Sequence, residues 1–194
     1  MAAVNDILNY LIQTLLGLYM FAMVLRFLLQ LVKADFYNPI CQFLVKITNP
    51  VVLPLRRIIP GYGGLDLSSL LIALVLQMLS LTALLLFKVG GLPSIGLLLI
   101  GSVLGLLALI LQLYFFALLA MIVLSWIAPG GQNPAVALLH QITEPVMAPF
   151  RKILPSLGGL DLSPILVFIS IGVLQRLLAH AAMALGVMQL IPWL

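Results

Sequence analysis

The sequence predicts an all-α membrane protein with four transmembrane helices, arranged as two helical-hairpin repeats that enter the bilayer in parallel orientation. Of the 194 residues, 64% are hydrophobic and only 7% are charged, whereas a soluble domain carries about 25% charged residues. Several apolar runs approach the roughly 20 residues that are needed to cross a hydrocarbon core. A water-soluble fold of this size could not bury so much apolar surface, so the bilayer must be its main solvent.

The chain contains one polar motif twice. Residues 38–69 align without a gap on residues 133–164, at a shift of 95 residues, and 17 of the 32 positions are identical. Only three of the identities are leucine, and the others include Asn, Thr, Pro, Arg, Gly, Asp and Ser. Apolar composition alone does not generate such matches, so the alignment indicates a true duplication.

Apolar stretches flank each copy, so the repeated unit is a span, the polar motif and a second span. The first repeat covers residues 1–90 and the second covers residues 91–194. The four expected spans lie at 7–31, 68–88, 105–127 and 164–188. Because each unit has an even number of spans, both units enter the membrane in the same direction, and both motifs lie on one face.

The apolar stretch at 95–127 is longer than a span needs, because a helix of this length would measure about 50 Å. One alternative is a single long, tilted helix. The other is that the glycines separate an interfacial or re-entrant piece at 92–104 from a span that begins near Gly105, and the register of the repeat favours this alternative. Gly101 and Gly105 also form a small-xxx-small pair that would let another helix approach closely.

Each motif begins with Asn-Pro, which is typical of a helix N-cap followed by proline at the first helical position. A short amphipathic helix in the headgroup plane is therefore expected in each cytoplasmic loop. Three prolines follow in each copy, at positions 50, 54 and 60 and at positions 145, 149 and 155. Prolines this close together predict that the backbone turns rather than continuing as one regular helix.

The basic residues predict the orientation of the chain. Six of them lie in the two motif loops, namely Lys33, Lys46, Arg56, Arg57, Arg151 and Lys152. The loop between the repeats offers only Lys88. The positive-inside rule therefore places the motifs in the cytoplasm and both termini outside. Four of these residues, Arg56, Arg57, Arg151 and Lys152, are expected to contact lipid phosphates, at about 1 kcal/mol per charge, or a protein partner.

Both motifs end in Gly-Gly-Leu-Asp-Leu-Ser, which turns the chain back into the membrane. Ser68 and Ser163 are expected to cap the spans that follow. Asp66 and Asp161 stand near helix N-termini, where negative charge is favoured, and each could pair with the first arginine of its own motif. The alternative is that the two carboxylates bind a cation or relay protons.

Ionisable residues inside the spans are candidate functional groups. Arg26 lies near the cytoplasmic end of the first span, so snorkelling toward the headgroups explains it. Arg176 lies about 20 Å into the fourth span, beside Gln175 and one turn before His180. Three alternatives follow for Arg176: contact with Asp6 at the start of the first span, a place in a polar cavity, or outward snorkelling.

The sequence offers no motif for catalysis, a cofactor or a metal. It has two histidines and one cysteine, with no phosphate-binding loop and no serine elbow. We therefore expect a protein that is not an enzyme. The net charge is +4. The basic residues lie beside hydrophobic spans, so they indicate orientation and not nucleic-acid binding.

Two copies of the pattern TxPxxxPxR(R/K)xxPxxGGLDLS, each preceded by Asn-Pro and set between hydrophobic spans, resemble the YggT family of small bacterial membrane proteins. That family is related to the YlmG proteins of other bacteria and chloroplasts. The resemblance covers both repeats, although the first copy has Ser69 where the second has Pro164. It implies a bacterial inner-membrane protein associated with osmotic-stress tolerance, compensation of potassium-uptake defects, and cell division or membrane organisation. It implies no catalytic residue.

Two functions remain open. The first is a scaffold or assembly factor whose basic, proline-rich face contacts membrane lipids and a membrane or division-associated protein. The alternative is an ion-handling, potassium-related transporter or channel component, for which Arg176, Gln175 and Gln77 are the intramembrane polar candidates. A homo-oligomer is also left open.

Overall fold

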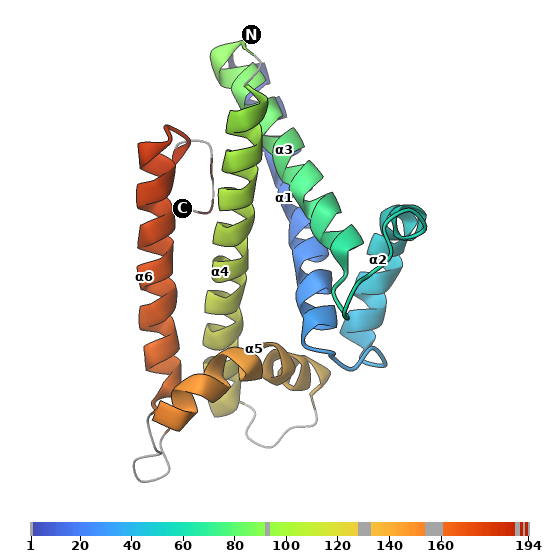
Figure 1. Ribbon diagram of the computed structural model, residues 1–194, viewed down its shortest axis with the longest axis vertical. Helices are drawn as coiled ribbons and strands as arrows, with labels where there is room; N and C mark the ends of the chain where they lie inside the picture. Colours follow the sequence, from blue (N-terminus) through green and yellow to red (C-terminus); the bar gives the residue numbers. More distant parts are fainter. Residues whose placement is uncertain are drawn as a thin grey trace.

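The computed structural model describes residues 2–91, 94–127, 133–153 and 161–188, together with Ile191 and Trp193. Within them lie six α-helices (Figure 1): α1 (Ala2–Leu31), α2 (Pro39–Arg56), α3 (Leu67–Val89), α4 (Ile95–Ile127), α5 (Pro134–Ile153) and α6 (Ser163–Ala184). Helices α1, α3, α4 and α6 are long and apolar enough to cross a membrane. The described residues form no β-strand. The prediction of an all-α protein with four spans is confirmed.

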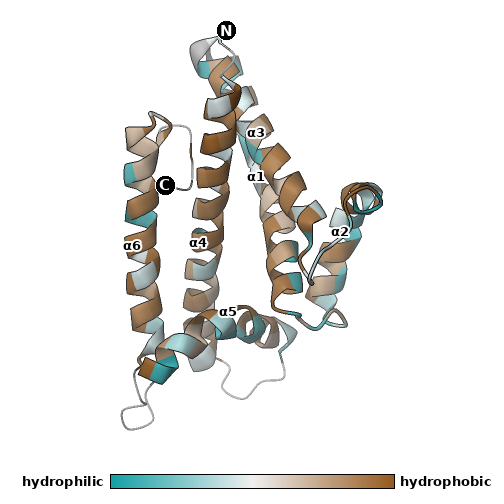
Figure 2. Cartoon of the chain, viewed as in Figure 1, coloured by the Kyte–Doolittle hydropathy of each residue, from teal (hydrophilic) through white to brown (hydrophobic). Residues whose placement is uncertain are grey.

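The spanning helices form one row of packed neighbours. Helix α1 packs along α3, and α4 packs against α3 on one side and α6 on the other. Helices α2 and α5 lie at the end of the bundle opposite the N-terminus (Figure 1). Figure 2 shows hydrophobic residues along most of the spans and hydrophilic residues on α2 and α5, with isolated hydrophilic bands on α6.

The two motif helices meet at their N-terminal ends. Asn38 Nδ2 donates a hydrogen bond to the carbonyl oxygen of Pro134 at 2.7 Å. The backbone N–H of Asp35 donates to Gln141 Oε1 at 3.0 Å. Both motifs therefore lie at the same end of the bundle, as parallel repeats require.

Helix α4 runs without interruption from Ile95 to Ile127, so the expected break near Gly105 is wrong. Instead, its glycines let α3 approach. A Cβ atom at Gly101 would lie 3.2 Å from Leu81 Cδ1, and one at Gly105 would lie 2.5 Å from Gln77 Nε2. Glycine leaves the helical hydrogen bonds intact, and here the missing side chains make room for a neighbouring helix.

The prolines divide between the motif helices and the turns that follow them. Helix α2 contains Pro50 and Pro54 but ends at Arg56, before Pro60, so the prediction that the three prolines of the first copy do not all lie in one regular helix is confirmed. Helix α5 contains Pro145 and Pro149. Residues four apart share one helix face, and all four prolines are exposed. The carbonyl groups that lose their helical partners therefore share one exposed face, where water or headgroups can reach them. Helix α2 changes direction partway along its length (Figure 1), as proline-containing helices do.

Both motif helices are amphipathic, as predicted. Helix α2 buries Cys41, Leu44, Thr48 and Val52. Helix α5 buries Leu138, Ile142, Thr143 and Met147. Spacings of three or four residues, with Ile142 and Thr143 adjacent in α5, place each set on one side of its helix. Helix α2 ends before Pro60, whereas Pro155 and the second glycine pair lie outside the described residues.

The contact between α3 and α4 predicts the effect of adding one methyl group. Gly105→Ala should lower the free energy of unfolding by about 1–3 kcal/mol, because its Cβ would overpack against the buried Gln77 side chain. The control is Gly96→Ala in the same helix, where a Cβ meets no atom within 4 Å. It should be neutral or stabilising by up to about 1 kcal/mol. Thermal unfolding in detergent measures both, and the explanation fails if Gln77→Ala does not rescue Gly105→Ala.

Candidate functional site

Side chains from three helices converge on Asp66, at the point where the first motif returns to the membrane. Asp66 is fully buried and is the N-cap of α3. Its Oδ2 atom accepts hydrogen bonds from Arg26 Nε at 3.3 Å and from Arg56 Nη2 at 2.6 Å. Ser69 donates to the same carboxylate through its backbone N–H and its hydroxyl group. One carboxylate therefore joins α1, α2 and α3, and the predicted pair of Asp66 with Arg56 is confirmed.

Arg26 is the unexpected member of this centre. Its side chain is 5% exposed, and its Nη1 atom donates to Thr48 Oγ1 and to Asn49 Oδ1 at 2.8 Å. The expectation that Arg26 snorkels toward the headgroups is wrong, because its hydrogen-bond partners lie inside the protein. A buried charge is tolerated when it is paired and hydrogen-bonded in this way.

The buried position and the partners of Asp66 have opposite effects on its acidity. Burial alone would raise the pKa of the carboxyl group, but the hydrogen bonds from Ser69 and the charges of Arg56 and Arg26 outweigh it. The net result is a pKa below the ordinary value of 3.8. Asp66 is therefore a charged structural ligand for arginine at neutral pH, not a proton carrier.

The second motif builds a related centre around Arg151. Its Nη1 atom donates to both carboxylate oxygens of Glu144 at 2.7 Å, and its Nε atom donates to Asp161 Oδ2 at 2.8 Å. The predicted pair of Asp161 with Arg151 is confirmed. The pKa of Arg151 is raised, first by its hydrogen bond to Asp161 and then by its hydrogen bonds to Glu144. The pKa of Asp161 is lowered, chiefly by hydrogen bonding to Ser163.

The two centres differ in charge at two equivalent positions. At the shift of 95 residues, Met121 stands where the first repeat has Arg26, and Glu144 stands where it has Asn49. The first centre therefore holds two guanidinium groups and one carboxylate, and the second holds one guanidinium and two carboxylates. The second is also more open, since the Asp161 side chain is 41% exposed.

The serine caps expected at Ser68 and Ser163 are wrong. Helix α3 is capped by Asp66, and Ser68 Oγ donates instead to the carbonyl oxygen of Ile59 at 2.8 Å. Ser163 is the first residue of α6, and its backbone N–H donates to Asp161 Oδ1 at 2.9 Å. In both repeats the aspartate takes the free N–H groups, because an ionised carboxylate is a stronger acceptor than a hydroxyl group.

The four basic residues at the motif ends divide into two kinds. Arg56 and Arg151 bind carboxylates of their own repeats. Arg57 and Lys152 are exposed and have no ion-pair partner among the described residues. The second basic residue of each motif is therefore the one that is available to lipid phosphates or to a partner.

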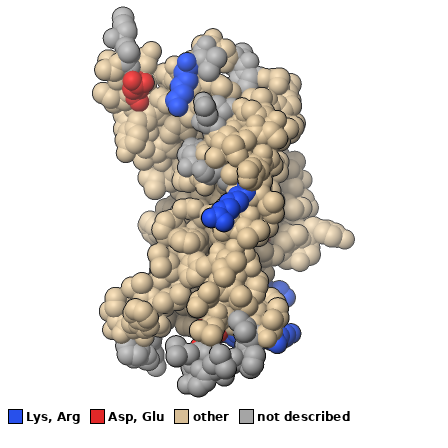
Figure 3. Space-filling view, turned by 90° about the vertical axis from the view of Figure 1, so that its left-hand side faces the viewer, with Lys and Arg blue, Asp and Glu red and all other residues tan. Residues whose placement is uncertain are grey.

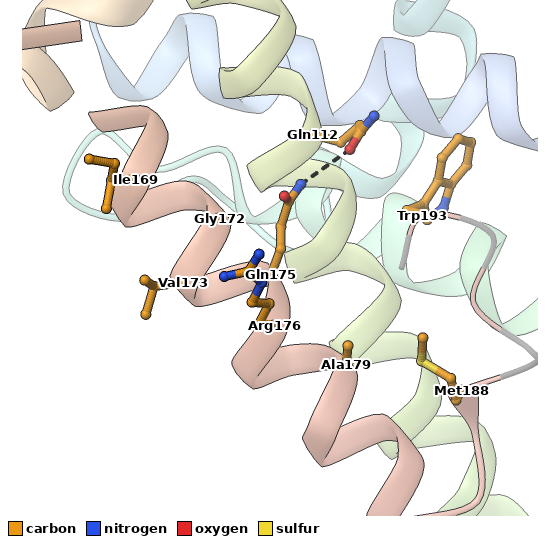
Figure 4. A pocket seen from close by; sticks show the side chains of 9 residues that line it. All are labelled: Gln112, Ile169, Gly172, Val173, Gln175, Arg176, Ala179, Met188 and Trp193. Carbon is orange, nitrogen blue, oxygen red and sulfur yellow. Dashed lines mark hydrogen bonds between the residues drawn. The ribbon is translucent and has the colours of Figure 1, made fainter. Parts of the chain in front are cut away.

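The predicted contact between Asp6 and Arg176 is wrong. The two side chains form no ion pair, and α6 packs against α4 and α5, away from α1. Arg176 and Gln175 instead line a cavity of about 670 Å³ between α4 and α6 (Figure 4). Gln175 Nε2 donates to Gln112 Oε1 of α4 at 3.2 Å. His180 is exposed and is not part of this lining.

Metal ligands do not gather in the part of the chain that the structure describes, where no three His, Cys, Asp or Glu side chains could hold an ion together. Cys41 is buried, and burial raises the pKa of its thiol, so it is a packing residue.

Sequence reasoning missed Arg26, Thr48 and Asn49 as members of the first centre. The signal was present in the repeat alignment, where the change from Arg26 to Met121 accompanies the change from Asn49 to Glu144. Two charge-altering differences at aligned positions indicate that the residues share one electrostatic environment. Reading the spans and the motif separately concealed this link.

The two carboxylates predict unequal effects of the same substitution. Asp66→Asn should lower the free energy of unfolding by about 3–5 kcal/mol, because it leaves Arg26 buried without a counter-charge. Asp161→Asn is the matched control in the second repeat, and should lower it by about 0–1 kcal/mol because that pair is open to water. Thermal unfolding in detergent at neutral pH measures both, and equal losses would refute the assignment.

The lowered pKa of Asp66 also sets the pH dependence of this difference. Because the folded-state pKa lies below the unfolded value of 3.8, the stabilisation is complete well above that pH and is lost as the pH falls through the folded-state pKa. The stability gap between the wild type and Asp66→Asn should therefore stay constant down to about pH 5 and narrow only below about pH 4. A gap that narrowed near neutral pH would contradict this.

Comparisons with known proteins agree with the repeat. The family model described as CCB3/YggT matches the chain twice, at residues 5–87 and 100–182, again at a shift of 95 residues. A protein of Pseudomonas aeruginosa is 47% identical over 183 residues, which cover 93% of this chain and 92% of that protein. YggT of Escherichia coli K12 is 38% identical over 187 residues, which cover 94% and 95%.

A third relative, ycf19 of Guillardia theta, is 32% identical over 75 residues, which cover 38% of this chain but 82% of that protein. That coverage is what a relative with a single repeat unit would give. No solved structure matches the chain. With four membrane-spanning helices, two copies of the motif and both copies matched by the family model, this multi-pass membrane protein belongs to the CCB3/YggT family.

Proposed function

We propose that this protein is a non-enzymatic scaffold or assembly factor of the bacterial inner membrane, with helices α2 and α5 as its working surface. The observation that carries the proposal is the placement of these helices. Both lie at one end of the bundle and contact each other, and each is tied to a following span by an arginine–aspartate pair. The spans then hold a fixed surface in place.

The exposed sides of α2 and α5 suit the membrane boundary. Helix α2 exposes Phe43 and Val51 beside Lys46, while Arg57 and Lys152 extend from the ends of the two helices. Apolar side chains next to cations are typical of helices that lie among anionic headgroups. Lipids and a membrane or division-associated protein are therefore the partners that we propose, within the osmotic-stress and cell-division roles that the family resemblance implies.

The ion-handling alternative has less support. The cavity between α4 and α6 has polar residues in its lining, but Arg176 is the only charged one among the described residues. A fixed positive charge repels potassium, and pores for cations are lined by carbonyl or carboxylate groups. We therefore prefer the scaffold.

The proposed orientation places α2 and α5 in the cytoplasm, because the motif loops carry most of the basic residues. Cys41 is fully buried and should not react with the label, so any labelling reports the added cysteine. Ser94→Cys should react with a membrane-impermeant maleimide on intact cells, whereas Tyr37→Cys, at a site that is 90% exposed, should react only after permeabilisation. Labelling of Tyr37→Cys from outside would reverse the orientation.

The scaffold function is tested by photo-crosslinking in living cells. A photoreactive residue at Phe43 in α2 or at Lys152 in α5 should give the same discrete protein product, because both helices belong to one surface. The control is Ile169 in α6, which is 58% exposed on a span and should not give that product.

Purified protein in potassium-loaded liposomes should show no potassium flux. Potassium-selective flux that Arg176→Gln removes would overturn the scaffold in favour of ion handling. If neither motif helix gave a protein product, the scaffold would also be rejected.

A further inference from the structure

The cavity between α4 and α6 has a composition that the scaffold function does not use. It is lined by the three polar residues Gln112, Gln175 and Arg176, by Trp193, and by apolar side chains that include Ile169 and Val173. In Figure 4, Gln175 reaches from α6 toward Gln112 on α4, and Trp193 lies on the C-terminal segment. Helix α6 is also the least buried of the four spans, so the other helices leave this side of the cavity free.

Hydrogen-bond donors outnumber acceptors in this cavity. The bond from Gln175 Nε2 uses Gln112 Oε1, so the amide NH₂ of Gln112 remains as a donor. Arg176 adds a guanidinium group, which has donors only. The indole N–H of Trp193 is buried and has no acceptor among the described residues. A bound group that complements this set must be rich in acceptors.

The depth of Arg176 gives the charge of that group. Arg176 lies 13 residues after Ser163, the first residue of α6, which corresponds to about 20 Å along the helix. It has no ion-pair partner in the described ranges. The face shown in Figure 3 is mostly uncharged, and its basic side chains are set apart from one another. Arg176 is the only Lys or Arg of α6. A cation inside a span is costly unless it is paired, so the missing partner is an anion.

We propose that this cavity binds the head of an anionic amphiphile, a carboxylate or phosphate carried on a hydrocarbon chain. Arg176 is the counter-ion, and Gln112 is the second donor. The walls at Ile169 and Val173 contact the chain, which a free inorganic anion lacks. Helix α6 continues for eight residues beyond Arg176, to Ala184, about 12 Å, so the site lies below the surface and is reached from the lipid.

The test uses Trp193 as the reporter. The chain has two tryptophans, and Trp126→Phe removes the other, which is 81% exposed. In neutral maltoside micelles, dodecanoate and dodecyl phosphate should each change Trp193 emission with saturation. Neutral dodecanol and inorganic phosphate should not, because one lacks the charge and the other the chain.

Arg176→Gln should weaken binding of both anionic amphiphiles at least about tenfold, as expected for the loss of a hydrogen bond to a charged group. Arg176→Lys keeps the charge and should restore most of the binding, which separates a binding defect from misfolding. The matched control is Lys88→Gln, which removes an equal charge from the exposed last turn of α3 and should leave binding unchanged.

Equal binding by dodecanol, equal binding by inorganic phosphate, or full binding by Arg176→Gln would each overturn the proposal. If the partner of Arg176 is instead an acidic side chain of another membrane protein, the purified protein will respond to neither amphiphile, and the proposal is likewise overturned. None of these outcomes bears on the scaffold, which depends on α2 and α5.

Discussion

The buried carboxylate of Asp66 is the constraint on which the first half of the structure depends. Its oxygens accept hydrogen bonds from two guanidinium groups and from Ser69. This single side chain therefore holds together the span α1, the motif helix α2 and the start of the span α3. Moving charged groups out of water costs free energy, and this cost is offset only when every buried charge is paired. The same condition explains why the glycine turn returns the chain to this point, since Asp66 must cap α3 while it faces Arg26 and Arg56.

Duplication has kept this geometry while changing its charges. Each repeat retains the motif arginine, the aspartate ten residues later and a threonine that bonds within its helix. Two of the differing positions belong to these centres or lie beside them: Met121 corresponds to Arg26, and Glu144 corresponds to Asn49. In the second repeat Thr143 Oγ1 contacts Met121 Sδ at 3.2 Å, where Thr48 meets a guanidinium in the first. One centre is consequently closed and cationic, and the other is open and anionic.

Hydropathy and repeat register predicted the spans, the shared end of the motifs and the two arginine–aspartate pairs, because these depend on composition and on short separations in sequence. The errors arose at residues whose structure is determined by contacts with residues distant in the sequence. Gly105 suggests a break in the helix, but α3 packs against this glycine and the helix continues. Arg26 suggested snorkelling because its partner Asp66 lies 40 residues away, a distance that neither periodicity nor local motif can bridge.

The polar contacts inside the membrane can also be compared between the two repeats. In the first repeat Gln13 of α1 bonds Ser80 of α3, and in the second Gln112 of α4 bonds Gln175 of α6. Ser80 and Gln175 are equivalent at the shift of 95 residues, so each hairpin has a polar tie at a corresponding level. The next residue differs: Leu81 is buried against Gly101 of α4, whereas Arg176 faces an open cavity. Helix α3 has a neighbour on that side and α6 has none within the described chain. The position that one repeat uses for packing is thus free in the other to hold a charge, which the proposed anionic amphiphile would pair.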